Sequence, residues 1–259
     1  MLPTPCTSHV SFDTIYEPSE DSYLFLDTLS SSSESAWLSQ RFASTPTPLV
    51  VEVGTGSGVV LAFTAANSGQ IFGRRDILPL GIDVNRDACL ATRGTVVKAV
   101  EERQSEPDTA VKMKTPYLAS VTSDLTTSLR PGAVDVLLFN PPYVPTEALP
   151  ELPVSGGGRE EEEPRSKFDE ESYLLSLTYA GGMDGMETTR RLLDAIPGIL
   201  HPTTGVAYVL LCKQNRPEEV KQGIRDWGGG WQAETVGNSG RQAGWEKLVI
   251  VRIWRSFII

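Results

Sequence analysis

The apolar positions of the chain gather in short runs that are separated by segments of helical length. Short apolar runs that alternate with helices are typical of a mainly parallel sheet whose two faces are both covered by helices. The last run is closely preceded by another one, so we expect a terminal hairpin that gives the sheet an antiparallel edge strand. The expected strands cover residues 49–53, 79–84, 117–121, 134–139, 205–212, 231–236 and 246–254.

The segments between and before these runs are expected to be helices. The first, at 17–29, opens with the acidic residues that a helix N-terminus favours, and a second one, at 36–42, ends before two prolines. The remaining expected helices cover residues 58–68, 86–103, 188–200 and 217–227. The pattern therefore predicts one α/β domain over residues 1–259, built on a seven-stranded, mostly parallel sheet.

Residues 146–170 differ in composition from the rest of the chain. They contain three consecutive glycines, a run of glutamates and several prolines. Such a segment buries too little apolar surface to offset the entropy lost on ordering. We expect a flexible acidic and glycine-rich insertion that acts as a solvated spacer, and contact with a basic partner is the alternative.

Composition narrows the class of partner and the compartment. The formal net charge is −10, which opposes tight binding to naked nucleic acid because that affinity comes largely from neutralised phosphates. The three cysteines are scattered and form no Cys-x-x-Cys pair, so neither a disulfide framework nor a zinc site is indicated. No apolar stretch reaches the ~18 residues of a membrane span. We expect a cytoplasmic protein, with the nucleus as a second location.

The first expected strand runs directly into a glycine-rich turn formed by Gly54, Gly56 and Gly58. Glycines allow positive φ there and let a ligand approach the backbone. A dinucleotide fingerprint would place its third glycine at the position of Val59, whereas this turn is similar to the first motif of class I methyltransferases. Glu52 precedes it and would repel a pyrophosphate but suit the ammonium and sulfonium of S-adenosylmethionine. The alternative is a tight connection between strand and helix.

Acidic residues follow the next two expected strands. Asp83 stands where a carboxylate can accept hydrogen bonds from both hydroxyls of a ribose, although it could instead cap the helix that starts near Arg86. Asp124 follows the third strand, where the methyltransferase resemblance places an acidic side chain near the adenine amino group. Leu125 would then pack on the base, with a plain Asx turn as the alternative.

The tetrapeptide Asn140-Pro141-Pro142-Tyr143 follows the fourth expected strand. It resembles the motif of methyltransferases that modify amide or exocyclic amino nitrogens. A planar nitrogen donates two N–H bonds, which the side-chain oxygen of Asn140 and the carbonyl of Pro141 could accept, while the ring of Tyr143 stacks on the flat group. This grip predicts orientation of the acceptor nitrogen for an in-line displacement.

Three further stretches resemble the eukaryotic and archaeal release-factor glutamine methyltransferases, and this resemblance extends over nearly the whole chain. They are Tyr16-Glu17-Pro18-Ser19-Glu20-Asp21-Ser22, Ala180-Gly181-Gly182-Met183-Asp184-Gly185 and Arg241-Gln242-Ala243-Gly244. The resemblance implies a class I, Rossmann-like fold and an N-terminal helical lid at 1–47, with Glu20 and Ser22 as cofactor contacts. It also implies a class I translation release factor as substrate, methylated on the glutamine of its Gly-Gly-Gln loop, and a small zinc-binding activator subunit.

Several alternatives stay open at this point. The same tetrapeptide could grip the amino group of a flipped adenine in a nucleic acid, and a lysine methyltransferase or an inactive cofactor-binding subunit is less well matched. Residues 181–185 could border the acceptor channel or form a plain loop before a helix, and Arg241 could contact substrate or cap the final hairpin. Apolar residues at 71–72 and 77–80 are compatible with an activator surface and equally with the core.

Overall fold

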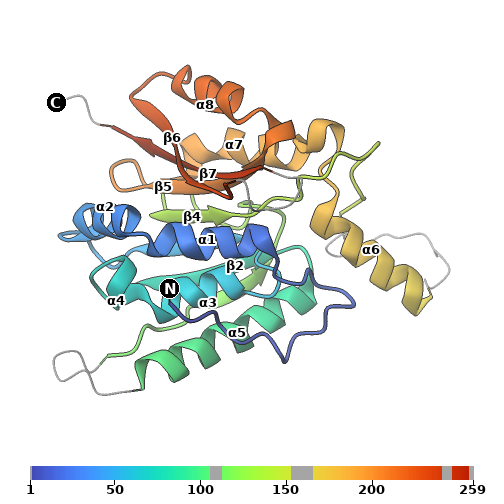
Figure 1. Cartoon of the computed structure of the whole chain (residues 1–259), viewed down its shortest axis with the longest axis horizontal. Coiled ribbons are helices and arrows are strands. Elements are labelled where there is room, and N and C mark those ends of the chain that lie inside the picture. The colour runs from blue at the N-terminus through green and yellow to red at the C-terminus, as the bar shows by residue number, and fades with distance from the viewer. Residues whose placement is uncertain (1, 106–112, 153–165, 241–246, 257–259) are drawn as a thin grey trace.

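A mixed sheet forms the centre of the molecule in the computed structural model, which describes residues 2–105, 113–152, 166–240 and 247–256. The seven strands lie in the order β3-β2-β1-β4-β5-β7-β6 (Figure 1). They are β1 (Leu49–Val53), β2 (Leu78–Asp83), β3 (Ala119–Thr122), β4 (Val136–Phe139), β5 (Val206–Cys212), β6 (Trp231–Asn238) and β7 (Leu248–Arg255). The first five are parallel, and β7 is antiparallel to β5 and β6. The predicted sheet and its terminal hairpin are confirmed, and the reversed strand is second from the edge.

The central strands are apolar on both faces because helices cover both faces. Successive residues of β1 illustrate this, since Val50 belongs to one core cluster and Val51 to the other. The first cluster lies under the helices α1 (Glu20–Ser30), α2 (Ser32–Phe42), α3 (Val59–Ala66), α4 (Ser68–Ile71) and α5 (Arg86–Gln104). The second lies under α7 (Glu187–Ile199) and α8 (Pro217–Arg225), on the opposite face (Figure 1).

Two helices differ from the expectation. The second helix begins at Ser32 rather than at residue 36, because the side chain of Ser31 caps it by accepting a hydrogen bond from the backbone N–H of Glu34 at 3.3 Å. The serine run, which interrupts the apolar pattern, is therefore a helix start. The helix α6 (Lys167–Tyr179) was not predicted, and it projects from the body beside the carboxyl ends of the strands (Figure 1).

The proposed insertion at 146–170 is described only at its two ends. Residues 146–152 contain no helix or strand, α6 begins inside the range, and residues 153–165 lie outside the described residues. The apolar residues Ile71, Phe72, Ile77 and Leu80 are all buried, so the core alternative holds for them. The described residues also include two short 3₁₀ turns, η1 (Met183–Gly185) and η2 (Lys213–Asn215).

Candidate active site

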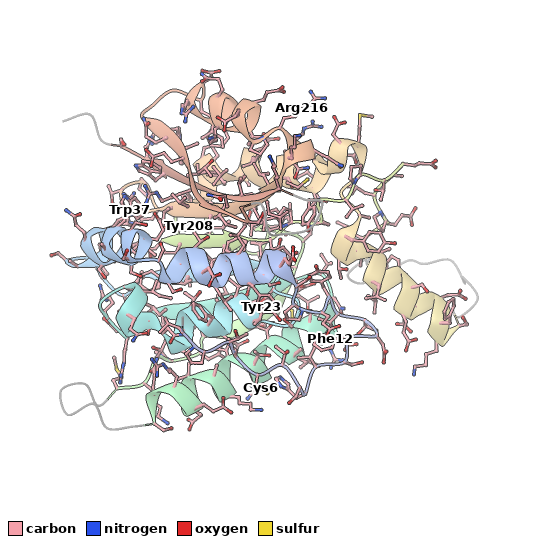
Figure 2. The ribbon with its side chains drawn as sticks, viewed as in Figure 1. Cys6, Phe12, Tyr23, Trp37, Tyr208 and Arg216 are labelled. Carbon is pink, nitrogen blue, oxygen red and sulfur yellow. The ribbon has the colours of Figure 1, made fainter. Side chains whose placement is uncertain are left out.

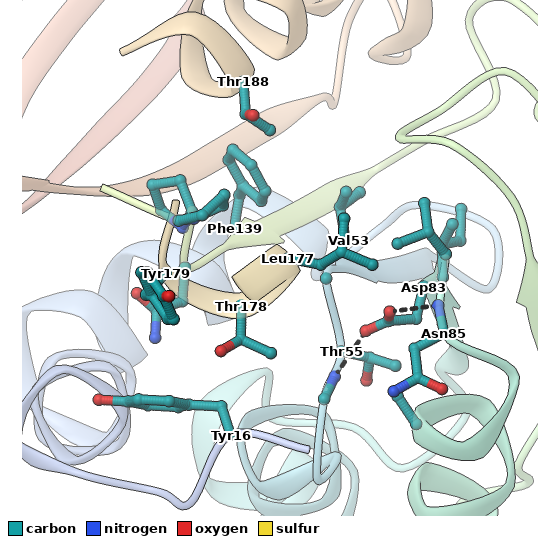
Figure 3. A pocket seen from close by; sticks show the side chains of 18 of the residues that line it. Tyr16, Val53, Thr55, Asp83, Asn85, Phe139, Leu177, Thr178, Tyr179 and Thr188 are labelled. Carbon is teal, nitrogen blue, oxygen red and sulfur yellow. Dashed lines mark hydrogen bonds between the residues drawn. The ribbon is translucent and has the colours of Figure 1, made fainter. Parts of the chain in front are cut away.

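The sequence motifs meet at the carboxyl ends of the parallel strands. Parallel strands place their carboxyl ends together, and the strand order reverses between β1 and β4, which is where ligands bind in open α/β sheets. A pocket lies at these strand ends. It is lined by residues that follow β1, β2, β3 and β4, together with part of the N-terminal segment and α6. Figure 3 shows Tyr16, Thr178 and Tyr179 in one half of the pocket and Thr55, Asp83 and Asn85 in the other.

The three glycines of the turn after β1 do not have the same task. Gly54 and Gly56 line the pocket, with φ values of +65° and +51° that favour glycine. Gly58 is not among the lining residues, and a Cβ placed on it would lie 2.6 Å from the Cα of Thr92 in α5. The close approach explains why residue 58 is a glycine, since it allows α3 to pack closely on α5, and its contact with the cofactor stays a prediction.

Glu52 lies under the turn and is 5 % exposed. Its Oε2 accepts hydrogen bonds from the Thr55 hydroxyl at 2.9 Å and from the Leu61 backbone N–H at 3.0 Å. Burial raises the pKa of Glu52 from an ordinary 4.5 to about 8, against the lowering effect of these two hydrogen bonds. Glu52 also lines the pocket, where a bound cation would favour its ionised form.

Asp83 ends β2 and holds the glycine turn rather than capping the next helix. Its Oδ2 accepts a hydrogen bond from the Gly56 N–H at 2.9 Å, and its Oδ1 accepts one from the Asn85 N–H at 2.8 Å. The cap of α5 is Asn85, which accepts a hydrogen bond from the Asp87 N–H. Burial raises the pKa of Asp83, which lines the pocket as expected. The helix-cap alternative for Asp83 is wrong.

Asp124 and Leu125 line the pocket after β3. Asp124 forms an ion pair with Arg191 of α7, a lining residue that the sequence gave no reason to select. Leu125 has a φ of +48°, a left-handed conformation that costs free energy in a residue with a branched side chain. The structure thus keeps a strained leucine beside a paired carboxylate at this position.

Asn140 follows β4 and is hydrogen-bonded to α1. Its Nδ2 donates to Oδ2 of Asp21 at 3.0 Å, whereas its Oδ1 is screened from solvent and has no hydrogen-bond partner among the described residues. An unsatisfied buried acceptor costs about 1–3 kcal/mol, and a ligand that donates a hydrogen bond to this oxygen would remove the cost. Pro141, Pro142 and Tyr143 line the same pocket.

The glycine-rich loop at 181–185 supports the tetrapeptide from behind. A Cβ on Gly185 would lie 2.0 Å from the carbonyl oxygen of Tyr143, and one on Gly181 would lie 2.6 Å from that of Pro142. No residue from 181 to 185 lines the described pocket, although Ala180 does. Of the two alternatives, the structure favours a loop that packs against the tetrapeptide backbone over one that borders the channel.

The N-terminal segment brings residues to the pocket beside those named from the resemblance. Glu20 is exposed and Ser22 is buried, and neither is among the lining residues, so their contact with the cofactor stays a prediction. Asp21 lies between them on the inward face of α1 and does line the pocket, together with Thr14, Ile15 and Tyr16. Which face of α1 points inward depends on how the helix packs on α3 and the sheet.

A wall of uncharged side chains closes the side of the pocket away from the glycine turn. Its residues come from α6 and from the segment after the tetrapeptide, and they are Val144, Leu149, Pro150, Leu152, Leu174, Leu177, Thr178 and Tyr179. The sequence prediction missed this wall because the insertion appeared to be free of structure. Arg241 and its neighbours at 242–244 lie outside the described residues.

The described residues contain no group of three or more His, Cys, Asp or Glu side chains that could hold a metal ion. None of the three cysteines, all within the described residues, forms a disulfide bond. Within the described ranges, none of the helices combines the length and the apolar character needed to cross a membrane.

Comparisons with known proteins agree with this geometry. No family model matches the chain. The E. cuniculi Mtq2–Trm112 complex, which is responsible for the methylation of the translation termination factor eRF1, contains a chain with the same fold, with a TM-score of 0.54, 23 % identity, and coverage of 94 % of this chain and 99 % of that one.

Two sequence relatives cover almost the full length. The eRF1 methyltransferase catalytic subunit mtq2 of Schizosaccharomyces pombe is 30 % identical, over 98 % of this chain and 96 % of the relative. The mouse methyltransferase HEMK2 is 31 % identical, over 98 % of each chain. The sheet, the pocket and these relatives together show that the chain belongs to the family of methyltransferases that includes mtq2 and HEMK2.

Proposed function

We propose that the protein transfers a methyl group from S-adenosylmethionine to the side-chain amide of the Gly-Gly-Gln glutamine in a class I translation release factor. The observation that carries the proposal is the unpartnered Oδ1 of Asn140 at the pocket, which fits a planar amide that donates an N–H. The name of the Schizosaccharomyces pombe relative, an eRF1 methyltransferase catalytic subunit, supports a release factor as acceptor.

The residues of the pocket fit this cofactor by their chemistry. The glycine turn leaves room for a close approach to the backbone, and a Cβ on Gly54 would lie 3.9 Å from the ring of Phe139, another residue that lines the pocket. Glu52 supplies a carboxylate for a cationic ligand, Asp83 supplies one for ribose hydroxyls, and Asp124 with Leu125 borders the place for the base. When bound, S-adenosylmethionine supplies an electrophilic methyl group.

The chain's own residues hold and orient the acceptor. Asn140 Oδ1 and the Pro141 carbonyl accept the two N–H bonds of the amide, which stabilises the positive charge that develops on its nitrogen. Tyr143 packs on the flat face of the group. The uncharged wall formed by α6 and residues 144–152 excludes water and suits a small, uncharged loop of an acceptor protein. No strong base is needed in this arrangement.

We also propose that a small zinc-binding activator subunit covers the β3 edge of the sheet. Support comes from the E. cuniculi complex, which contains a second protein, Trm112. It also comes from Leu118 and Met113, which precede β3 and are 49 % and 54 % exposed. An open strand edge with apolar neighbours can pair with a strand of another chain. Leu118→Asp should then weaken co-purification of the activator.

The activity is tested with labelled S-adenosylmethionine and a purified eukaryotic release factor, with and without the activator. The controls are the release factor with its Gly-Gly-Gln glutamine replaced and an unmethylated DNA duplex. We expect label on the wild-type factor alone. Asn140→Ala should lower turnover by about 100-fold or more while cofactor affinity, measured by calorimetry, changes little. Label on DNA, or on the factor that lacks the glutamine, would refute the proposed acceptor.

A further inference from the structure

The contact between α1 and the tetrapeptide joins two segments far apart in the sequence. We infer that Asp21 is a positioning residue whose carboxylate fixes the amide of Asn140 in the orientation that leaves Oδ1 free to accept from the acceptor nitrogen. Asp21 Oδ2 accepts the hydrogen bond from Asn140 Nδ2 at 3.0 Å. The inference rests on the proposed function, in which Asn140 grips the amide.

The chemistry of the carboxylate decides which way the Asn140 amide points. An amide has an oxygen that accepts and an NH₂ that donates, and either could face a neighbour that both donates and accepts. A carboxylate only accepts, so the NH₂ group must face Asp21 and Oδ1 must point away from it. This selection explains why Oδ1 is the atom of Asn140 left without a partner.

Asp21 is itself held in place. Its Oδ1 accepts hydrogen bonds from the backbone N–H of Ser22 at 2.6 Å and from the Ser22 hydroxyl at 3.2 Å, which leaves Oδ2 for Asn140. Asp21 is 4 % exposed, and none of the ion pairs among the described residues includes it. A buried carboxylate without a cationic partner is costly, which favours a functional reason for it. This arrangement also explains Ser22, which serves the pocket through Asp21.

A purely structural role is the competing explanation, because Asp21 also accepts a backbone N–H in the first turn of α1. The two roles differ in what a mutation changes. Loss of the hydrogen bond within the first turn lowers stability, whereas loss of amide orientation lowers kcat at unchanged cofactor affinity. Asp21→Asn is nearly isosteric, and its own amide can donate to Asn140 and allow the flipped orientation. We expect kcat to fall by roughly 100-fold, with little change in the Kd of the cofactor.

Another residue of the same helix offers a matched control. Asp27→Asn makes the same chemical change in α1, but Asp27 is exposed and does not line the pocket. Its kcat should equal that of the wild-type enzyme. Thermal unfolding of both variants checks the fold. Wild-type kcat in Asp21→Asn, or an equal loss in both variants, would overturn the inference.

An exchange of the two groups makes a sharper test. In Asn140→Asp two carboxylates face each other and neither can donate, so we expect a larger loss than in Asp21→Asn. In the double variant Asp21→Asn with Asn140→Asp, residue 21 donates, and residue 140 again turns an oxygen toward the acceptor. The double variant should recover about tenfold over Asn140→Asp alone. Additive losses, with no recovery, would contradict the orienting role.

A measurement without any acceptor separates this inference from the proposed function. In protein labelled with ¹⁵N-asparagine, the side-chain amide signal of Asn140 is identified by its loss in Asn140→Ala. One amide proton should show the protection expected of a hydrogen bond to a carboxylate, which Asp21→Ala removes and Asp27→Asn preserves. If no release factor is methylated, the proposed function fails, and these signals still decide the contact. An Asn140 signal unchanged in Asp21→Ala would overturn the inference.

Discussion

At the scale of single residues, the glycines after β1 show how one motif serves two purposes. Gly58 has a φ of +74°, and an added Cβ would meet the Thr92 backbone at 2.6 Å, whereas the nearest atom to a Cβ on Gly56 lies at 4.0 Å. Gly58→Ala should therefore lower the free energy of unfolding by about 2–4 kcal/mol, through overpacking and left-handed strain. Gly56→Ala carries only the strain, about 1–2 kcal/mol. Urea unfolding of both variants measures the difference, and equal losses would contradict the packing role of Gly58.

Glu52 makes the stability of the ligand-free protein depend on pH. Its pKa is raised from 4.5 to about 8 on folding, so between these values the folded state keeps a proton that the unfolded state has released. Unfolding therefore becomes easier as pH rises from about 4.5 to about 8. Glu52→Gln removes this dependence and should raise the free energy of unfolding at pH 8 by about 1–3 kcal/mol, relative to wild type.

The measurement is urea unfolding of wild type and Glu52→Gln at pH 5 and pH 8. The advantage of the variant should be small at pH 5 and larger at pH 8. A difference independent of pH would show that Glu52 is ionised in the folded protein across this range.

The sequence places a residue at the pocket most directly where the residue follows a strand. Glu52, Asp83, Asp124, Leu125 and Asn140 were selected because they flank strand ends, and all line the pocket. The pattern gives less guidance where the position depends on which side of a helix faces inward, as at Glu20 and Ser22, which do not line it. It also could not find Arg191, because a basic residue on an amphipathic helix gives no signal that it will reach Asp124, 67 positions away.

At the scale of elements, a buried ion pair attaches α2 to the terminal hairpin. Glu34, 3 % exposed, accepts hydrogen bonds from Arg252 Nη1 at 2.8 Å and from the Tyr208 hydroxyl at 2.8 Å. The guanidinium of Arg252 lies 4.2 Å from the ring centroid of Trp37. Figure 2 shows Trp37 and Tyr208 beside α2, far from α6 along the long axis of the molecule. This contact holds elements together outside the pocket.

Glu34→Ala should lower the free energy of unfolding by about 3–5 kcal/mol, because Arg252 and the Tyr208 hydroxyl would then be buried without their partner. The matched control is Glu234→Ala, which removes a second carboxylate from the same arginine, at 3.0 Å but with a side chain 58 % exposed. That change should cost less than about 1 kcal/mol. Chemical unfolding measures both, and similar losses would show that burial does not set the value of this pair.

The elements that the sequence could predict are those with a regular apolar pattern. The strands were found because each is a short apolar run, and α5 and α7 because they are long and bounded by turns. The helix α6 was missed because it has no buried residue and follows a segment rich in glycine and glutamate. Its residues Leu174 and Leu177 line the pocket, and none of its side chains is buried in the core, so the periodicity of a core-facing helix is weak.

At the scale of the whole molecule, the pocket brings together parts of the chain that are far apart in the sequence. Its lining includes Thr14 to Tyr16, the ends of β1, β2 and β4, and residues of α6 and α7. The sequence predicted the place where the strands contribute to the pocket, since the carboxyl ends of parallel strands must lie together. It could not predict the uncharged wall, which depends on how α6 and residues 144–152 pack across the opening.

A ligand that binds only the folded chain stabilises all of it, by about 2.7 kcal/mol at a concentration 100 times its Kd. For a chain of this length, that corresponds to a rise in Tm of roughly 5–10 °C. We expect this shift with S-adenosylmethionine in the wild-type protein and in Asn140→Ala, which keeps the glycine turn intact. Asp83→Ala should lose most of it, because Asp83 holds the Gly56 N–H and contributes the carboxylate expected to bind the ribose.

Differential scanning calorimetry measures the shift for each variant, referred to its own ligand-free Tm so that any change in intrinsic stability cancels. A full shift in Asp83→Ala would place the cofactor away from the end of β2, and its loss in Asn140→Ala would mean that the tetrapeptide binds the cofactor rather than the acceptor.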